Sequence, residues 1–229
     1  MLGITSTKKL ANLMVGAGLA LAPMGAGAFS ITSADLPQYG TDVNLGFATV
    51  TAVPTTFTHK SVAGYDVVGI LGGYEGGEVD LAKEAMVFEF TTPSVIANLD
   101  LGLLFKAGEE DDLYNEIAKV IVYTSQGEIA YTLTVIDATT AAWSGPGTVT
   151  NVSPATYGNA AVWSISNPFG DAAVNGFALV GEGPDAPTDY RNNDYGFVGL
   201  NGRAVPEPGT LMLMGFGLLG LGAAGRKRS

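Results

Sequence analysis

The residue types that most often carry out catalysis are scarce in this chain. It contains no cysteine and a single histidine, His59. The lack of cysteine excludes disulfides, thiolate zinc sites and cysteine nucleophiles. A Ser-His-acid triad would depend entirely on His59, which lies in a polar stretch, and no Gly-x-Ser-x-Gly nucleophile elbow is present. The sequence therefore predicts a protein that is not an enzyme.

Carboxylates are the abundant ionisable groups. Glycoside hydrolysis needs two carboxyl groups about 5 to 10 Å apart, but no spacing here marks a particular pair. Calcium takes six to eight oxygen ligands from flexible loops, and none of the acidic loops matches an EF-hand. Solvated loop carboxylates that maintain solubility are the alternative explanation. Three acidic groups lie in predicted loops: Glu75, Glu78 and Asp80; Glu109 to Asp112; and Asp185, Asp189 and Asp194. The last group has the best mixture of ligand types and is our candidate calcium site.

Loop aromatics could form a flat platform on which sugar rings stack. Most of them stand beside Gly, Asn or Asp, although ordinary core and loop aromatics share this setting. Trp163 lies in an apolar run and is expected in the core. The loop set comprises Tyr74, Tyr114, Trp143, Tyr157, Tyr190 and Tyr195, of which our candidate sugar-stacking residues are Trp143, Tyr190 and Tyr195.

The elements that must position these residues are predicted to be β-strands. Short apolar segments alternate with Gly, Pro, Asn, Asp and Thr, and no sustained helical periodicity is present. We expect an all-β fold, a single β-sandwich or jelly-roll-like domain. The predicted strands, enough for two sheets, are 43–53, 65–71, 85–90, 99–105, 119–124, 128–136, 161–166, 176–180 and 195–201.

One hairpin is predicted with a specific turn. Ser125-Gln126-Gly127 joins two apolar segments, and Gly127 suits the position that needs a positive φ.

The N-terminus differs from the middle of the chain. Lys8 and Lys9 precede an apolar run from Leu10 to Leu21, which is too short to span a bilayer and is followed by Ala26-Gly27-Ala28. This order predicts a secretory leader, residues 1–28, cut by signal peptidase after Ala28.

The C-terminus has three elements in a fixed order. Pro206-Glu207-Pro208 precedes an uncharged apolar stretch at 209–225, and the basic residues Arg226, Lys227 and Arg228 follow. Prolines have a locked φ and donate no backbone hydrogen bond, so they favour an extended, accessible segment. The apolar stretch is long enough for a transmembrane helix, and the basic cluster places its end in the cytoplasm.

The segment between these termini is strongly acidic. Without the terminal segments it has six basic and 21 acidic residues, a net charge of about −15. A binder of phosphate backbones needs clustered Lys and Arg, so nucleic acid is excluded as an expected partner.

The last 25 residues resemble the PEP-CTERM sorting signal of Gram-negative bacteria, through Pro206-Glu207-Pro208, the Gly-rich apolar stretch and Arg226-Lys227-Arg228. The resemblance implies recognition by an exosortase, a membrane-embedded cysteine protease or transpeptidase that removes the helix and releases or transfers the body. Such proteins typically occur in bacteria that make extracellular polysaccharide. The body at 29–204 is similar to the β-sandwiches that these proteins often carry, some of them like carbohydrate-binding modules.

These observations predict an exported surface or biofilm-matrix protein with segments 1–28, 29–204 and 205–229. The precursor would be held transiently in the inner membrane, and the mature body would lie at the cell surface or outside the cell. We expect a non-catalytic body that contacts extracellular polysaccharide, with no cofactor except calcium at the acidic site. The alternatives are a secreted carbohydrate-active enzyme that uses loop carboxylates, and a self-associating structural or adhesion protein.

Overall fold

A computed structural model describes residues 27–72, 76–80, 83–109, 113–181 and 194–205. These ranges form thirteen strands in a single antiparallel sheet and one short 3-10 helix, η1 (Ser33–Asp35). The strands are β1 (Ala28–Thr32), β2 (Asp42–Asn44), β3 (Ala48–Val53), β4 (Phe57–Val62), β5 (Tyr65–Ile70), β6 (Ala85–Gly102), β7 (Ile117–Thr124), β8 (Gly127–Val135), β9 (Ala141–Trp143), β10 (Thr148–Asn151), β11 (Trp163–Ser166), β12 (Val174–Val180) and β13 (Gly196–Ala204).

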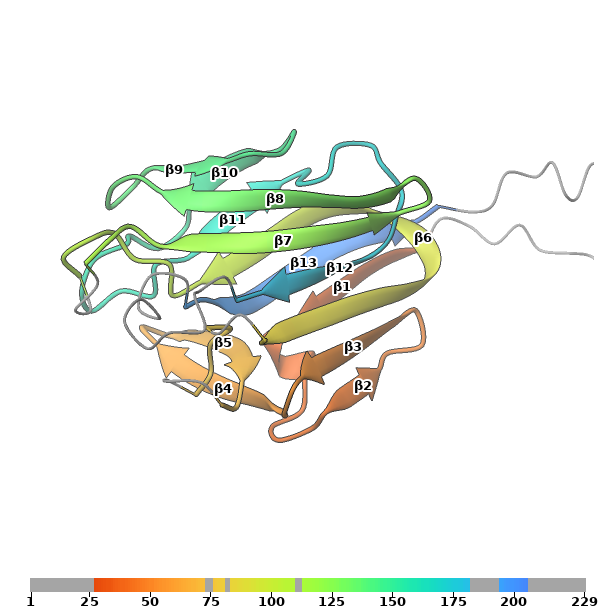
Figure 1. Cartoon of the computed structure of the whole chain (residues 1–229), viewed down its shortest axis with the longest axis horizontal. Coiled ribbons are helices and arrows are strands. Elements are labelled where there is room, and N and C mark those ends of the chain that lie inside the picture. Colours follow the sequence, from red (N-terminus) through yellow and green to blue (C-terminus); the bar gives the residue numbers. More distant parts are fainter. Residues whose placement is uncertain (1–26, 73–75, 81–82, 110–112, 182–193, 206–229) are drawn as a thin grey trace, which may run out of the picture.

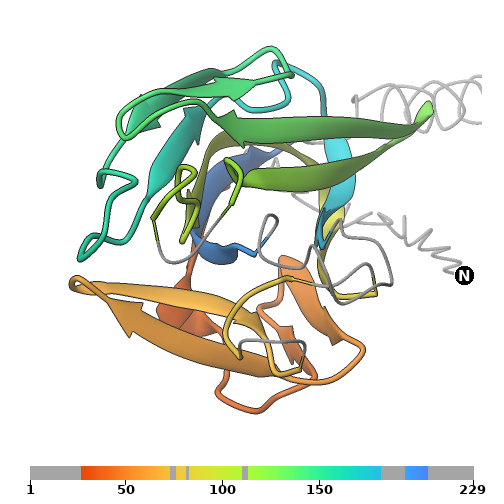
Figure 2. The ribbon, with the colours of Figure 1, turned by 60° about the vertical axis from the view of Figure 1, so that its left-hand side comes forward.

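The long strand β6 joins the two halves of the sheet. Its first half, Ala85–Phe90, lies between β3 and β12. Its second half, from Ser94 onward, pairs with β13 and β11. The strand bends between these halves and carries the sheet around the core (Figures 1 and 2). The all-β prediction is therefore confirmed, but the predicted segments 85–90 and 99–105 belong largely to one strand, and the two expected sheets are hydrogen-bonded into one.

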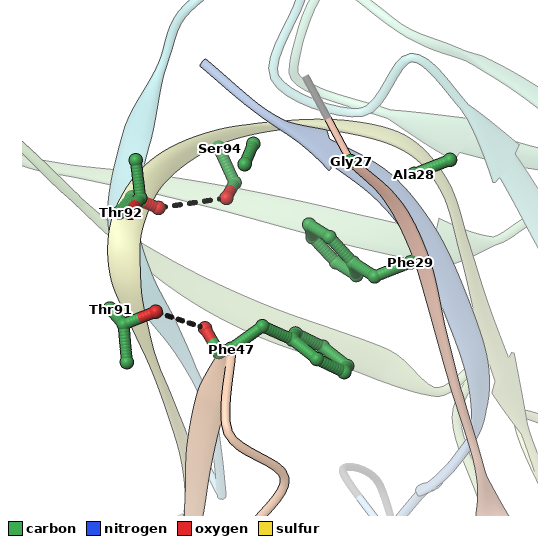
Figure 3. A pocket seen from close by; sticks show the side chains of 8 residues that line it. Gly27, Ala28, Phe29, Phe47, Thr91, Thr92 and Ser94 are labelled. Atoms are coloured by element: carbon green, nitrogen blue, oxygen red, sulfur yellow. Dashed lines mark hydrogen bonds between the residues drawn. The ribbon is translucent and has the colours of Figure 1, made fainter. Parts of the chain in front are cut away.

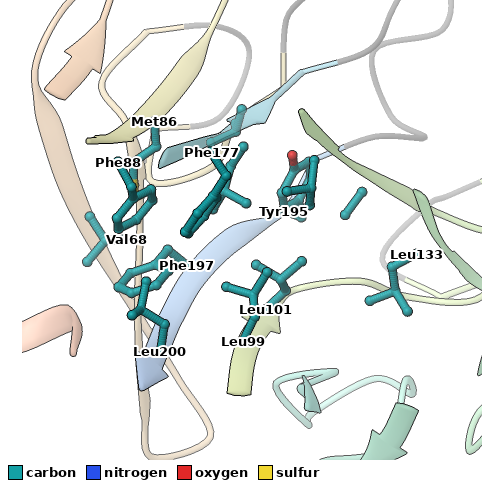
Figure 4. Close-up of a cluster of buried hydrophobic side chains, with 14 of the residues drawn as sticks. Val68, Met86, Phe88, Leu99, Leu101, Leu133, Phe177, Tyr195, Phe197 and Leu200 are labelled. Atoms are coloured by element: carbon teal, nitrogen blue, oxygen red, sulfur yellow. The ribbon is translucent and has the colours of Figure 1, made fainter. Parts of the chain in front are cut away.

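Aromatic side chains from several strands fill the core. Phe88 on β6 stacks on Phe177 of β12, with ring centroids 4.5 Å apart, and lies 5.0 Å from the ring of Phe197 on β13. All three are fully buried, and aliphatic residues from the neighbouring strands surround them (Figure 4). Burial of apolar area on one face of each strand is the principal force that holds the curved sheet together.

Trp163 occupies the core, as its sequence context predicted. Its side chain is fully buried on β11, and its indole Nε1–H donates to the carbonyl oxygen of Leu104 at 3.0 Å. A buried indole needs such an acceptor because an unpaired polar group in the interior is costly. The bond ties the segment that follows β6 to β11.

The predicted β7–β8 hairpin is confirmed. Thr124 pairs with Gly127 across a turn formed by Ser125 and Gln126, and Gly127 has a φ of 121°. That conformation favours glycine because it lacks a Cβ.

Two short hairpins were not recognised in the sequence. The predicted strand 43–53 is divided into β2 and β3 by a turn in which Gly46 has a φ of 84° and its amide donates to the side chain of Asn44. The polar stretch around His59 is not among the predicted strands, but Phe57–Val62 pairs along its whole length with β5. Pattern alone misses such strands because an edge hairpin needs little apolar alternation.

The molecule has two distinct ends, which we name for what lies there. At the tail end, where the described chain begins and ends, the start of β1, the end of β13 and the bend of β6 lie together (Figure 1). Strands β7 and β8 run from their turn at this end to the opposite one, the loop end. The segments 103–109, 113–116, 136–140 and 152–162 gather at the loop end.

Candidate functional site

The predicted calcium site falls mostly outside the described residues. Asp185 and Asp189 lie outside them, and Asp194 is half-buried directly before Tyr195. Among the residues that the structure describes, no group of three or more His, Cys, Asp or Glu side chains could hold a metal ion. Calcium binding at this acidic group therefore stays a prediction.

The three candidate sugar-stacking residues have different surroundings. Tyr190 lies outside the described residues. Tyr195 has 0% exposure, and its hydroxyl lies 2.7 Å from the carbonyl oxygen of Lys119 and 3.0 Å from that of Val180. A fully buried ring offers no face to a sugar, so the structure corrects this choice: Tyr195 is a core residue that links β13 to β7 and β12.

Trp143 is half-buried at the edge of the sheet on β9. Its Nε1–H donates to the carbonyl oxygen of Pro168 at 2.9 Å, and its ring centroid lies 5.5 Å from that of Tyr131. Tyr131 in turn stacks on Phe169. Trp143 is thus held in place by the fold, with part of its side chain exposed. Sugar contact at Trp143 stays a prediction.

Among the residues with described positions, four carboxylates are buried, which the sequence did not indicate. Glu78 forms an ion pair with Lys60 at 2.6 Å between Nζ and Oε1. The backbone amide of Asp80 donates to Oε2 of Glu84 at 3.0 Å. The buried set, each member at most 3% exposed, is Glu78, Asp80, Glu84 and Glu116. Glu78 and Asp80 were predicted as loop carboxylates, but here they take part in the packing of the fold.

His59 is bound by two acceptors. Its Nδ1 lies 2.9 Å from Oδ2 of Asp66, and its Nε2 lies 3.0 Å from the carbonyl oxygen of Leu36. These contacts connect β4 to β5 and to the segment after η1. Both ring nitrogens therefore take part in contacts that hold the edge hairpin in place.

The loop end is built from three segments that hydrogen-bond to one another. Nζ of Lys106 lies 2.7 Å from Oε1 of Glu109. The other carboxylate oxygen of Glu109 accepts the backbone amide of Tyr157 at 2.8 Å. Asn115 accepts the amide of Ala107 and donates to the carbonyl oxygen of Ile136. These bonds fix segments that are far apart in sequence into one surface.

Large apolar side chains are exposed on these bonded segments. Tyr157 is 78% exposed, Leu113 75%, Tyr114 59% and Ile136 52%. Isolated exposed apolar residues are ordinary, but a group on adjoining loops indicates a contact surface. We call this group the loop-end surface: Leu113, Tyr114, Ile136 and Tyr157. Tyr114 and Tyr157 belong to the loop aromatics noted in the sequence but were not among the three selected, because sequence cannot show which of them are exposed.

Acidic groups at the loop end are held in their charged forms. The hydrogen bond from Lys106, and then that from the Tyr157 amide, lowers the pKa of Glu109 below its usual 4.5. The backbone amide of Thr139 is the main cause of the lowered pKa of Asp137, with smaller contributions from hydrogen bonds of Thr140 and the Thr139 hydroxyl. The exposed tyrosines thus stand beside groups that are fixed by hydrogen bonds.

A pocket lies at the tail end, opposite the loop-end surface. It is a pocket of about 250 Å³ whose apolar wall is the pair Phe29 and Phe47, with ring centroids 4.8 Å apart. On the other side, the Thr91 hydroxyl donates to the Phe47 carbonyl oxygen and the Ser94 hydroxyl to that of Thr92 (Figure 3). Gly27, Ala28 and Ala204 complete the lining. Both ends of the described chain therefore border one pocket.

Residues 204–228 match the family model of the PEP-CTERM protein-sorting motif. The match begins at Ala204, the last residue of β13, so the motif starts where the folded body ends. The resemblance noted in the sequence is confirmed for this segment. No match was found among curated proteins or among solved structures.

The PEP-CTERM motif implies an exported protein that an exosortase processes and sorts to the cell surface. Its sorting residues Pro206, Glu207 and Pro208, the basic cluster Arg226 to Arg228 and the expected membrane helix at 209–225 lie outside the described residues. So does most of the predicted leader, including Ala26. In the ranges that the structure describes, no helix is long and apolar enough to cross a membrane.

Proposed function

We propose that this chain is a non-catalytic surface or matrix protein whose loop-end surface contacts extracellular polysaccharide. The single observation that carries this proposal is the exposure of Tyr114 and Tyr157 on loops that hydrogen bonds hold together. Tyrosine provides a rigid amphipathic ring, and an ordered ring can bind without a large loss of conformational entropy.

The placement of the loop-end surface supports the proposal. The described chain begins and ends at the tail end, where the sorting motif begins, whereas the segments that carry Tyr114 and Tyr157 lie at the loop end (Figure 1). A body held or transferred through its C-terminus would therefore present the loop-end surface away from its attachment. This orientation suits a protein that reaches into a surrounding polymer.

The polymer is proposed to be neutral or weakly charged. The sequence between the leader and the tail carries a net charge of about −15, which repels polyanions at low ionic strength. Recognition would depend on the tyrosine rings and on polar groups such as Asn115, with little contribution from charge attraction.

The test is calorimetric titration of the mature protein with polysaccharide purified from the producing bacterium. Binding heat is expected for the wild type, and the double variant Tyr114→Ala, Tyr157→Ala should bind at least about tenfold more weakly. Tyr39→Ala is the matched control, because Tyr39 is 65% exposed but lies on the connection between η1 and β2. Absence of heat from the wild type, or equal losses in the control, would contradict the proposal.

The proposal that the protein is not catalytic has a separate test. The mature protein should release no reducing ends during prolonged incubation with the same polysaccharide. Release that persists through purification and disappears after substitution of a loop carboxylate would replace this proposal with a carbohydrate-active enzyme.

A further inference from the structure

The sorting motif begins very close to the tail-end pocket. Ala204 lines the pocket, and the backbone amide of Val205 donates to the carbonyl oxygen of Pro93 at 2.8 Å. The next residue is Pro206, the first of the Pro-Glu-Pro element. Two residues of fully extended chain reach about 7 Å, so Pro206 cannot lie farther than that from Ala204.

This short reach restricts how an enzyme can engage the motif. Any protein that encloses Pro206 to Pro208 is much wider than 7 Å and must meet the body around the end of β13. The surface that it meets there is the pocket, with Phe29 and Phe47 on one side and Thr91, Thr92 and Ser94 on the other. The exosortase and the body therefore form an interface, and the pocket residues make up the body's side of it.

The pocket suits a side chain of a protein partner. Its apolar wall of two stacked phenylalanine rings can bury an apolar group, and the neighbouring threonine residues provide a polar edge. Phe29 also contacts Phe90, and Phe90 contacts the buried Phe177, so the wall is fixed to the core and is ordered before binding. An ordered concave site limits the entropy lost on association.

We propose that the tail-end pocket is an exosite for the exosortase, which binds the pocket and the sorting motif together. The predicted cut after Ala28 would remove Gly27 and Ala28, two residues that line the pocket, and so widen it on that side. The six remaining lining residues keep both the aromatic wall and the polar edge. The inference depends on the sorting motif and is independent of the polysaccharide proposal.

The test expresses the full chain in a host that carries the exosortase. Pulse labelling measures the rate at which the tail is removed, and intact mass identifies the product. Thr92→Arg fills the pocket with a long charged side chain and should slow removal of the tail about tenfold. Phe47→Ala removes part of the apolar wall and should slow it similarly. Thr150→Arg, an exposed position on β10, is the matched control and should be processed at the wild-type rate.

A linker variant distinguishes an exosite from simple obstruction. Insertion of about eight Gly and Ser residues between Val205 and Pro206 separates the motif from the pocket. An exosortase bound to the motif then meets the pocket at a lower effective concentration, so simultaneous binding of both sites becomes weaker. Processing should become slower. Faster processing would mean that the body hinders the enzyme and would overturn the proposal, as would wild-type processing of both pocket variants.

Two controls protect the interpretation. The thermal unfolding midpoint of each purified mature variant must match that of the wild type. If Thr92→Arg does not fold, the processing rate of Phe47→Ala tests the exosite instead. The mature protein is also mixed with vesicles of phosphatidylethanolamine and phosphatidylglycerol. Sedimentation with vesicles that Thr92→Arg abolishes would assign the pocket to lipid and overturn the exosite.

Discussion

The backbone amide of Ala204 donates to the carbonyl oxygen of Gly27 at 3.1 Å, so the first and last described strands meet at one edge of the pocket. Ala28 pairs with Arg203 in the same ladder. The two ends of the described chain therefore lie side by side, although Ala28 and Ala204 are 176 positions apart in the sequence. The predicted leader cut after Ala28 and the start of the sorting motif at Ala204 both lie at the tail end, away from the loop-end surface.

Replacement of both prolines of the sorting motif should block its processing. The variant Pro206→Ala, Pro208→Ala restores backbone donors and φ freedom, and so removes the preference for an extended, accessible segment that the two prolines are predicted to impose. Intact mass of the protein from its own host should show the tail still attached, whereas the wild type should begin at Phe29 and lack the tail. Pro154→Ala, at an exposed loop position, is the control. Normal processing of the double variant would contradict the role of the motif.

Gly202 and Gly199 on β13 should respond differently to the same change. A Cβ at Gly202 would lie 2.7 Å from the Val95 carbonyl oxygen and 2.9 Å from the Phe29 ring, whereas a Cβ at Gly199 would have its nearest neighbour at 3.5 Å. Gly202→Ala should lower the free energy of unfolding by about 1–3 kcal/mol, because backbone must move. Gly199→Ala should change it by less than about 1 kcal/mol. Urea unfolding of the two variants measures the difference, and equal losses would show that β13 is not packed as described.

The two tryptophans should give opposite fluorescence signals. Trp143→Phe leaves the buried Trp163, so emission should be blue-shifted and poorly quenched by acrylamide. Trp163→Phe leaves the half-buried Trp143, so emission should shift to the red and quenching should rise. Trp163→Phe should also cost about 1–3 kcal/mol of unfolding free energy, because the Leu104 carbonyl oxygen loses its donor. A similar quenching constant for both variants would contradict the burial of Trp163.

Acid should release the contact between Glu109 and the 152–162 segment. The folded-state pKa of Glu109 is lowered by Lys106 first and by the Tyr157 amide second. Its contribution to stability is therefore fully present above the usual pKa of 4.5 and is lost as pH falls through the lowered value. The Tyr157 amide resonance, followed by NMR between neutral pH and pH 2, should shift with that midpoint.

Glu109→Gln is the control for the acid response. The amide side chain keeps an acceptor for Tyr157 but does not titrate in this range, so the shift of the Tyr157 resonance should disappear. Persistence of the same midpoint in this variant would assign the transition to another group.

The sequence was informative where a local pattern is sufficient. Alternation in 128–136 and the turn at Ser125 to Gly127 predicted the β7–β8 hairpin, because turn geometry and strand period are properties of adjacent residues. Trp163 was placed in the core from its apolar neighbours. Strand β1 was missed because its first residue, Ala28, also belongs to the predicted leader cleavage site, and β4 was missed because it is polar.

The candidate site depended on contacts that no local pattern encodes. The path of the chain decides which tyrosine is exposed: Tyr195, directly before β13, lies in the interior, whereas Tyr157, whose amide donates to Glu109, lies at the surface. Likewise, the burial of Glu78 and Asp80 follows from pairing between β5 and residues after it, and their charge alone suggested exposure.

The sequence by itself determined the sorting motif, the acidic charge and the all-β class, because each is a property of composition or of residues close together in the chain. Only the tertiary structure decided that the two ends of the described chain share one pocket and that the exposed tyrosines lie at the opposite end. The reason is physical: strand pairing over long sequence separations follows from the burial of one shared core, and that burial depends on all the strands at once.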